Sequence, residues 1–141
     1  MSDVRELYQG LVLEHGRHPQ NFRTLEAADG TGEAHNPLCG DDVAVYVALA
    51  GGRIRDVAFQ GRGCVVATAS ASIMTASIKG ETTDEALALG ERFGRHLTGE
   101  EPGAVSGELA AFSGVSRFPA RIKCATLPWQ ALRAALGVTR R

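Results

Sequence analysis

One strand–turn–strand segment constrains the fold more than any other feature of the sequence. In the segment VAVYVALAGGRIRDVAFQG, bulky apolar residues alternate with smaller or polar ones on both sides of the pair Gly51 and Gly52. Alternation with a period of two is typical of half-buried strands, and a two-residue glycine turn joins antiparallel strands. The sequence therefore predicts an antiparallel hairpin with helices covering one of its faces.

Helical patterns lie on both sides of this hairpin. Apolar residues recur every three or four positions from Val4 to Val12, which predicts a first helix that Gly16 and Pro19 should end. The other expected elements are an edge strand near 31–36 and helices over 65–79, from the capping box Thr82 and Glu85 onward, over 106–112, and from about 126 to 136.

The last of these helices contains a proline. Because Pro128 lacks an amide hydrogen, we place it in the first turn of a helix that starts near Thr126. Together these elements predict an α+β fold in which a small antiparallel sheet of about three strands is covered by helices. No internal repeat or long linker interrupts the sequence, so a single domain over residues 1–141 is expected.

Composition and charge exclude several classes of protein. With 44% hydrophobic and 22% charged residues, the chain has the composition of a folded globular domain. The net charge is −1 and no basic run occurs, which argues against a nucleic-acid partner. No apolar stretch approaches the roughly 20 residues of a membrane span. The N-terminus has no signal-peptide pattern, so a cytoplasmic location is expected.

The three cysteines, Cys39, Cys64 and Cys124, each lie at the end of a predicted element. In a reducing compartment they favour metal or thiol chemistry over disulfides. Asp41 follows Cys39 by two positions, so in an extended segment both side chains would point the same way. Three thiolates and one carboxylate suit tetrahedral zinc. The carboxylate would be the weakest ligand, which makes ligand exchange plausible.

Other interpretations of these residues remain open. An alternative is that the cysteines are three buried small hydrophobic residues. Arg121 and Lys123 flank Cys124 and either offset the negative charge of the site or are solvated surface charges. Asp42 competes with Asp41 as a ligand, although the alternation of a strand places it on the opposite face.

The remaining candidates are histidines and aromatic residues. His15 and His18 lie in a segment that would be able to touch a partner protein, but lone histidines are more often surface or capping residues. Trp129 and Phe118 are expected in the core.

Three cysteine motifs and the N-terminal segment resemble a known family. The segments NPLCGD, FQGRGCVVATASASIMT and FPARIKCATLPW, together with LYQGLVLEHGRHPQN, resemble the U-type iron–sulfur cluster assembly proteins. The resemblance covers most of the chain. It implies a compact α+β fold with a small antiparallel sheet covered by helices.

Two departures from the IscU-like scaffolds resemble the SufU-like branch of this family. Lys123 stands where the IscU-like scaffolds have a histidine, and 60 positions separate Cys64 from Cys124, with an insert near 98–116. The resemblance implies a zinc-dependent sulfurtransferase that accepts persulfide sulfur from a SufS-type cysteine desulfurase and passes it to a Suf-type scaffold. The residues that it implies as zinc ligands are Cys39, Asp41, Cys64 and Cys124.

In the SufU-like interpretation, Cys39 leaves the metal to collect sulfur and Arg121 assists the transfer. In the IscU-like alternative, a [2Fe–2S] cluster is assembled on the same four ligands and the acceptor is Cys124. A third possibility is a purely structural zinc ion, but such sites usually contain only cysteine and histidine.

Overall fold

The predicted hairpin forms the centre and one edge of a three-stranded antiparallel sheet. β2 (Asp41–Ala50) pairs with β3 (Arg53–Arg62), and β1 (Gly30–Asn36) pairs with the other side of β2. Gly51 and Gly52 both have positive φ, as a two-residue hairpin turn requires. The computed structural model describes residues 2–37, 40–101, 103–105 and 107–137, and only the backbone of residues 2–9.

One face of the sheet is buried, and the strand alternation determines which residues lie there. Along β2 the side chains of Val43, Val45 and Val47 are buried in the core. Asp41 begins the same strand with the same parity, and its side chain is also buried. The pattern that forms the core therefore also turns one carboxylate inward at the end of the sheet.

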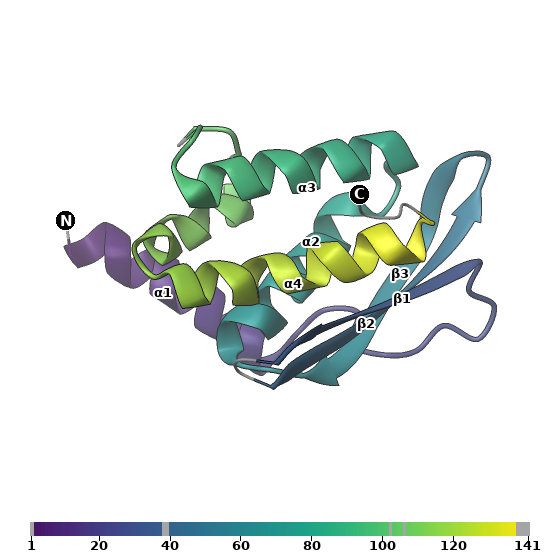
Figure 1. Cartoon of the computed structure of the whole chain (residues 1–141), viewed down its shortest axis with the longest axis horizontal. Helices are drawn as coiled ribbons and strands as arrows, with labels where there is room; N and C mark the ends of the chain where they lie inside the picture. The colour runs from purple at the N-terminus through teal and green to yellow at the C-terminus, as the bar shows by residue number, and fades with distance from the viewer. Residues whose placement is uncertain (1, 38–39, 102, 106, 138–141) are drawn as a thin grey trace.

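Helices cover this face in two layers (Figure 1). The helices are α1 (Ser2–Arg17), α2 (Val65–Ile78), α3 (Thr83–Thr98), the 3₁₀ helix η1 (Gly107–Arg117) and α4 (Pro119–Ala135). α4 lies over the sheet and contacts β1 and β2, whereas α2 contacts β3, α1 and α4. α3 lies farther from the sheet, on the other side of α4 (Figure 1). None of the described helices is long and apolar enough to cross a membrane.

Small residues allow α4 to lie against the edge strand. A Cβ atom on Gly32 would lie 2.2 Å from the carbonyl oxygen of Ala131, and one on Gly30 would lie 2.0 Å from that of Ala135. Any larger side chain at either position would push α4 away from the sheet. These two glycines therefore determine how closely the helix that carries Cys124 approaches the sheet.

The predicted capping box at the start of α3 is confirmed. The Thr82 side chain accepts a hydrogen bond from the Glu85 amide, and the Glu85 carboxylate accepts one from the Thr82 amide. Gly90, which weakens the helix pattern in sequence, has a packing role. A Cβ atom there would lie 3.0 Å from the Trp129 ring of α4.

Two element boundaries differ from the sequence prediction. The short helix expected over 106–112 is a 3₁₀ helix that runs on to Arg117, and Ser106 lies outside the described residues. The last helix begins at Pro119, seven residues before the predicted start at Thr126, so Pro128 lies inside it. Pro119 occupies the first turn, where a proline is favoured, so the start signal of this helix is Pro119 and not Pro128.

Candidate metal centre

Three of the four predicted ligands meet at one end of the sheet. One ligand atom each of Asp41, Cys64 and Cys124 lies within 4.8 Å of the other two. Asp41 begins β2, Cys64 precedes α2, and Cys124 belongs to α4, so three separate elements converge here. Cys39, the fourth predicted ligand and the predicted sulfur acceptor, lies outside the described residues.

The Asp41 carboxylate is buried but only partly paired. Asp41 is 3% exposed, and its Oδ1 accepts a hydrogen bond from the Cys64 amide at 3.1 Å. Among the described residues, its Oδ2 has no hydrogen-bond partner. An unpaired buried acceptor typically costs about 1–3 kcal/mol, and more when it is charged. A cation bound between Oδ2 and the two sulfur atoms would remove that cost.

Cys64 is the N-cap residue of α2, with extended backbone angles and no side-chain capping bond. The free amides at the start of a helix carry a partial positive charge and point towards this residue. The preceding residue is Gly63, where an added Cβ would lie 3.2 Å from Cγ of Asp41. The lack of a side chain at Gly63 therefore leaves room for the carboxylate beside the thiol.

Cys124 is buried within α4 rather than preceding it, which corrects the sequence prediction. It is the sixth residue of a helix that starts at Pro119, and it is 2% exposed. The influence of the helix dipole fades after the first turn, so the partial positive charge at the start of α4 does not reach Cys124. Cys124 is instead positioned by the packing of α4 against α2 and the sheet.

The basic residues near Cys124 are exposed. Arg121 and Lys123 both lie in the first half of α4 with exposed side chains. Arg121 precedes Cys124 by three residues, which places the two side chains on neighbouring parts of the helix surface. Phe118, the N-cap residue of α4, is 59% exposed, so the prediction that it belongs to the core is wrong. Trp129 is buried, as predicted.

The histidines lie away from the cysteine cluster or face solvent. His15 is buried, contrary to a role in touching a partner: its Nδ1 lies 2.7 Å from Ser72 Oγ and its Nε2 lies 3.4 Å from Glu108. His18 is exposed. The burial of His15 was detectable in the sequence, because His15 follows Leu11 by four residues and so continues the apolar stripe of the first helix.

The acid beside Asp41 faces the other way. Asp42 is exposed on the opposite face of the sheet, as strand alternation predicts, and it pairs there with His35 of β1. The prediction that Cys39 and Asp41 point the same way assumes an extended segment, but Gly40 between them has φ = +75° and is not extended.

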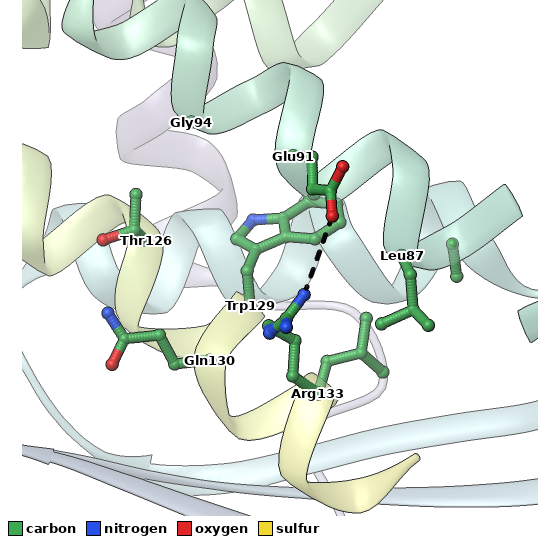
Figure 2. A pocket seen from close by; sticks show the side chains of 10 residues that line it. Leu87, Glu91, Gly94, Thr126, Trp129, Gln130 and Arg133 are labelled. Carbon is green, nitrogen blue, oxygen red and sulfur yellow. Dashed lines mark ion pairs between the residues drawn. The ribbon is translucent and has the colours of Figure 1, made fainter. Parts of the chain in front are cut away.

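Two hollows in the surface are lined by residues outside the group of Asp41, Cys64 and Cys124. A groove of about 460 Å³ runs between α3 and α4, and Figure 2 shows the Trp129 ring at its floor and an ion pair between Glu91 and Arg133 across it. A second hollow of about 570 Å³ lies on the outer face of the sheet beside His35 and Asp42. Neither is lined by a described cysteine.

Comparison with known proteins identifies the family. Residues 7–137 match the model of the NifU-like N-terminal domain. This chain belongs to that family. The family comprises the U-type iron–sulfur cluster assembly proteins, which agrees with the sequence motifs around the three cysteines.

Relatives within the family carry two different functional names. The chain is 38% identical to the iron–sulfur cluster assembly scaffold protein IscU of Streptococcus pyogenes serotype M1, over 96% of this chain and 86% of that one. It is 39% identical to the zinc-dependent sulfurtransferase SufU of Bacillus subtilis strain 168, over 96% and 93%. Identity alone therefore does not separate the two functions.

A solved structure supports the fold. A crystal structure of FiSufU from Fervidobacterium islandicum AW-1, a candidate scaffold protein for the SUF system, superposes with a TM-score of 0.84. It is 32% identical, and the match covers 89% of this chain and 93% of that one. The predicted α+β fold, with a three-stranded antiparallel sheet covered by helices, is confirmed.

Proposed function

We propose that this protein is a zinc-dependent sulfurtransferase that accepts persulfide sulfur from a SufS-type cysteine desulfurase during iron–sulfur cluster assembly. Cys39, Asp41, Cys64 and Cys124 would hold the zinc ion. The observation that carries the proposal is the buried Asp41 carboxylate, which lies beside two thiols and whose Oδ2 has no hydrogen-bond partner among the described residues. The similarity to the named sulfurtransferase supports it.

The donor set fits a divalent ion of intermediate softness. Two sulfur atoms and one oxygen within 4.8 Å of each other leave a fourth position for Cys39. Zinc, when bound, acts as a Lewis acid that keeps its cysteine ligands deprotonated at neutral pH. The amide of Cys64 holds Asp41 Oδ1, so Oδ2 is the oxygen presented to the ion.

Cys39 would carry out the transfer. Its thiolate attacks the terminal sulfur of the desulfurase persulfide, a new S–S bond forms at Cys39, and the desulfurase cysteine leaves as a thiolate. The sulfur arrives already in the persulfide oxidation state, so no further oxidant is needed. Arg121, exposed one helical turn before Cys124, would stabilise the anionic sulfur during this exchange. A Suf-type scaffold in the cytoplasm would then receive the sulfur.

The alternative is a scaffold that assembles a [2Fe–2S] cluster on the same four residues, as the name of the streptococcal relative suggests. Lys123 favours the transferase. It is exposed next to Cys124, and its ammonium group offers no lone pair to a metal at neutral pH, whereas an imidazole at that position would.

Metal analysis and a desulfurase assay test the proposal together. Purified protein should contain about one zinc per chain and should stimulate a SufS-type desulfurase severalfold. Cys39→Ala should abolish sulfur acceptance, measured as persulfide on the protein by mass spectrometry. Full acceptance by that variant, or iron with acid-labile sulfide in place of zinc, would contradict the proposal, and the second result would favour the scaffold.

Arg121 has a matched control in Arg117, which is also exposed and lies at the end of η1. Arg121→Ala should slow sulfur transfer without changing the zinc content, whereas Arg117→Ala should change neither. Equal transfer rates in the two variants would remove Arg121 from the reaction.

A further inference from the structure

Two of the cysteines belong to helices that pack directly against each other. Cys64 caps α2, Cys124 lies within α4, and the two helices are in contact. The distance between the two sulfur atoms therefore depends on how α2 and α4 are aligned along their lengths. Apolar contacts alone are non-directional and would tolerate small shifts along the helix axes.

Pro128 makes the backbone of α4 irregular close to Cys124. A proline inside a helix cannot donate to the carbonyl four residues earlier, here that of Cys124, and its ring pushes that carbonyl outward. Such a residue typically costs about 3 kcal/mol in a regular helix. The segment 124–128 is therefore a place where a contact from a neighbouring helix can affect the backbone of α4.

Ser70 of α2 supplies a directional contact at this place. Its side chain is fully buried, and its Oγ donates a hydrogen bond to the carbonyl oxygen of Ala125, the residue after Cys124. The same Oγ accepts a hydrogen bond from Trp129 Nε1 at 3.2 Å. One hydroxyl on α2 thus binds α4 on both sides of Pro128.

Trp129, which donates a hydrogen bond to the Ser70 hydroxyl, is itself held in place by packing. The Trp129 ring lies against Gly90 of α3, and its centroid is 5.5 Å from that of Phe93. Because the indole is packed from the α3 side, its N–H has a fixed direction towards Ser70. A buried polar network with every member satisfied specifies one arrangement of the surrounding helices.

We infer that Ser70 is a positioning residue for the metal centre: through Ala125 and Trp129 it sets the register of α2 and α4 and so the spacing of Cys64 and Cys124. The inference rests on the proposed zinc site. Ser70 follows Cys64 by six residues, about 9 Å along the helix, so it acts on the ligands through the two helices and touches none of them directly.

Ser72 provides a matched control on the same helix. It is also fully buried, but its Oγ binds His15 of α1 and the amide of Gln20, not α4. Ser70→Ala and Ser72→Ala each remove one buried hydroxyl and leave polar partners unpaired, so a similar loss of stability is expected from both. Only Ser70→Ala should change the geometry of the thiol pair.

The test compares zinc affinity and cobalt spectra of the two variants with those of the wild-type chain. Ser70→Ala should lower zinc affinity about tenfold, as is typical for residues that orient ligands, and should shift the cobalt d–d bands and thiolate-to-cobalt charge-transfer bands. Ser72→Ala should remain within about twofold of wild type with an unchanged spectrum. Denaturant unfolding of the metal-free proteins measures the stability cost separately.

If the two serine variants have equal zinc affinities and equal cobalt spectra while the wild type binds normally, the role of Ser70 is refuted and the proposed zinc site is not. A wild-type chain without thiolate-to-cobalt bands would overturn the proposed zinc site and the inference with it. If Ser70→Ala does not fold, Trp129→Phe keeps one aromatic ring beside Phe93 and removes the indole N–H together with the second ring. It should lower zinc affinity about threefold, and an affinity equal to that of Ser72→Ala would refute the inference.

Discussion

Asp41 and Asp56 are carboxylates on neighbouring strands, but the protein pairs them very differently. Asp56 of β3 lies 2.9 Å from Arg23 Nη2, 3.1 Å from Lys79 Nζ and 2.9 Å from the Val57 amide. Asp41 of β2 is more deeply buried and has one described partner, the Cys64 amide. Among the described residues, no arginine, lysine or histidine pairs with it.

The difference separates a carboxylate that is paired within the chain from one that is proposed to bind a metal ion. Burial by itself raises the pKa of Asp56, but the hydrogen bonds from Lys79 and Arg23 outweigh it, and the net pKa is lowered below the ordinary value of 3.8. Its negative charge is therefore stabilised within the chain. At Asp41 the second oxygen has no such partner, so its charge is available to an added cation. The following predictions test this distinction.

The largest expected effect follows from removing the unpaired carboxylate. Asp41→Ala should lower zinc affinity by at least about 100-fold, since residues that only orient metal ligands already contribute 10–100-fold. Asp42→Ala is the matched control, because Asp42 is the adjacent acid on the exposed face and should leave zinc affinity unchanged. Competition with a chromophoric chelator measures both. Equal affinities in the two variants would mean that Asp41 is not a ligand.

A smaller effect is expected from crowding Asp41 without removing it. In Gly63→Ala the new Cβ would lie 3.2 Å from Asp41 Cγ and 3.3 Å from its Oδ1, so the carboxylate must move by a few tenths of an ångström. Zinc affinity should fall about tenfold. Gly114→Ala, where a Cβ meets nothing within 4 Å, is the control. Unchanged zinc binding in Gly63→Ala would show that the carboxylate tolerates displacement.

Asp56 should behave in the opposite way. Asp56→Asn should lower the free energy of unfolding by about 1 kcal/mol, as partly exposed ion pairs do, and should leave zinc affinity unchanged. A double-mutant cycle with Arg23→Gln, followed by urea denaturation, should give less than additive losses because both changes remove the same pair. A loss of zinc binding in Asp56→Asn would contradict the conclusion that only Asp41, of these two acids, serves the metal site.

The smallest effect concerns the Glu85 carboxylate in the capping box of α3. Its pKa is lowered, mainly by the hydrogen bond from the Thr82 amide, below the ordinary value of 4.5. A lowered folded-state pKa means that this stabilisation is complete above pH 4.5 and is lost as pH falls through the folded-state value. The difference in Tm between wild type and Glu85→Gln should therefore be constant near neutrality and vanish in acid. A difference that grows in acid would contradict this sign.

Local patterns predicted most of the fold. The alternation along β2 gave the buried face and also separated Asp41 from Asp42, and the spacing of Thr82 and Glu85 identified the start of α3. These predictions succeeded because each depends on residues that are neighbours in the chain. Strand parity and helix capping are determined over a few positions.

The start of α4 has a local signal in Pro119, whereas the continuation of the helix through Pro128 does not follow from a local pattern. Pro128 indicates a helix start when only its own helix is considered. The helix nevertheless continues through Pro128, and Ser70, 55 positions before Ala125, donates a hydrogen bond to the Ala125 carbonyl from a neighbouring helix. The convergence of Asp41, Cys64 and Cys124 is predicted by their ligand chemistry and by the family resemblance, because no local pattern relates three positions on different elements.

The position of Asp41 at the first residue of β2 also limits how the gene can vary. Successive side chains of a strand face opposite sides, so adding or removing one residue between Asp41 and the buried valines would turn the carboxylate to the outer face. Asp42 would face inward in its place only if both acids moved by one position relative to the buried valines. Single-residue insertions and deletions should therefore be far more damaging at this end of β2 than point substitutions of its exposed residues.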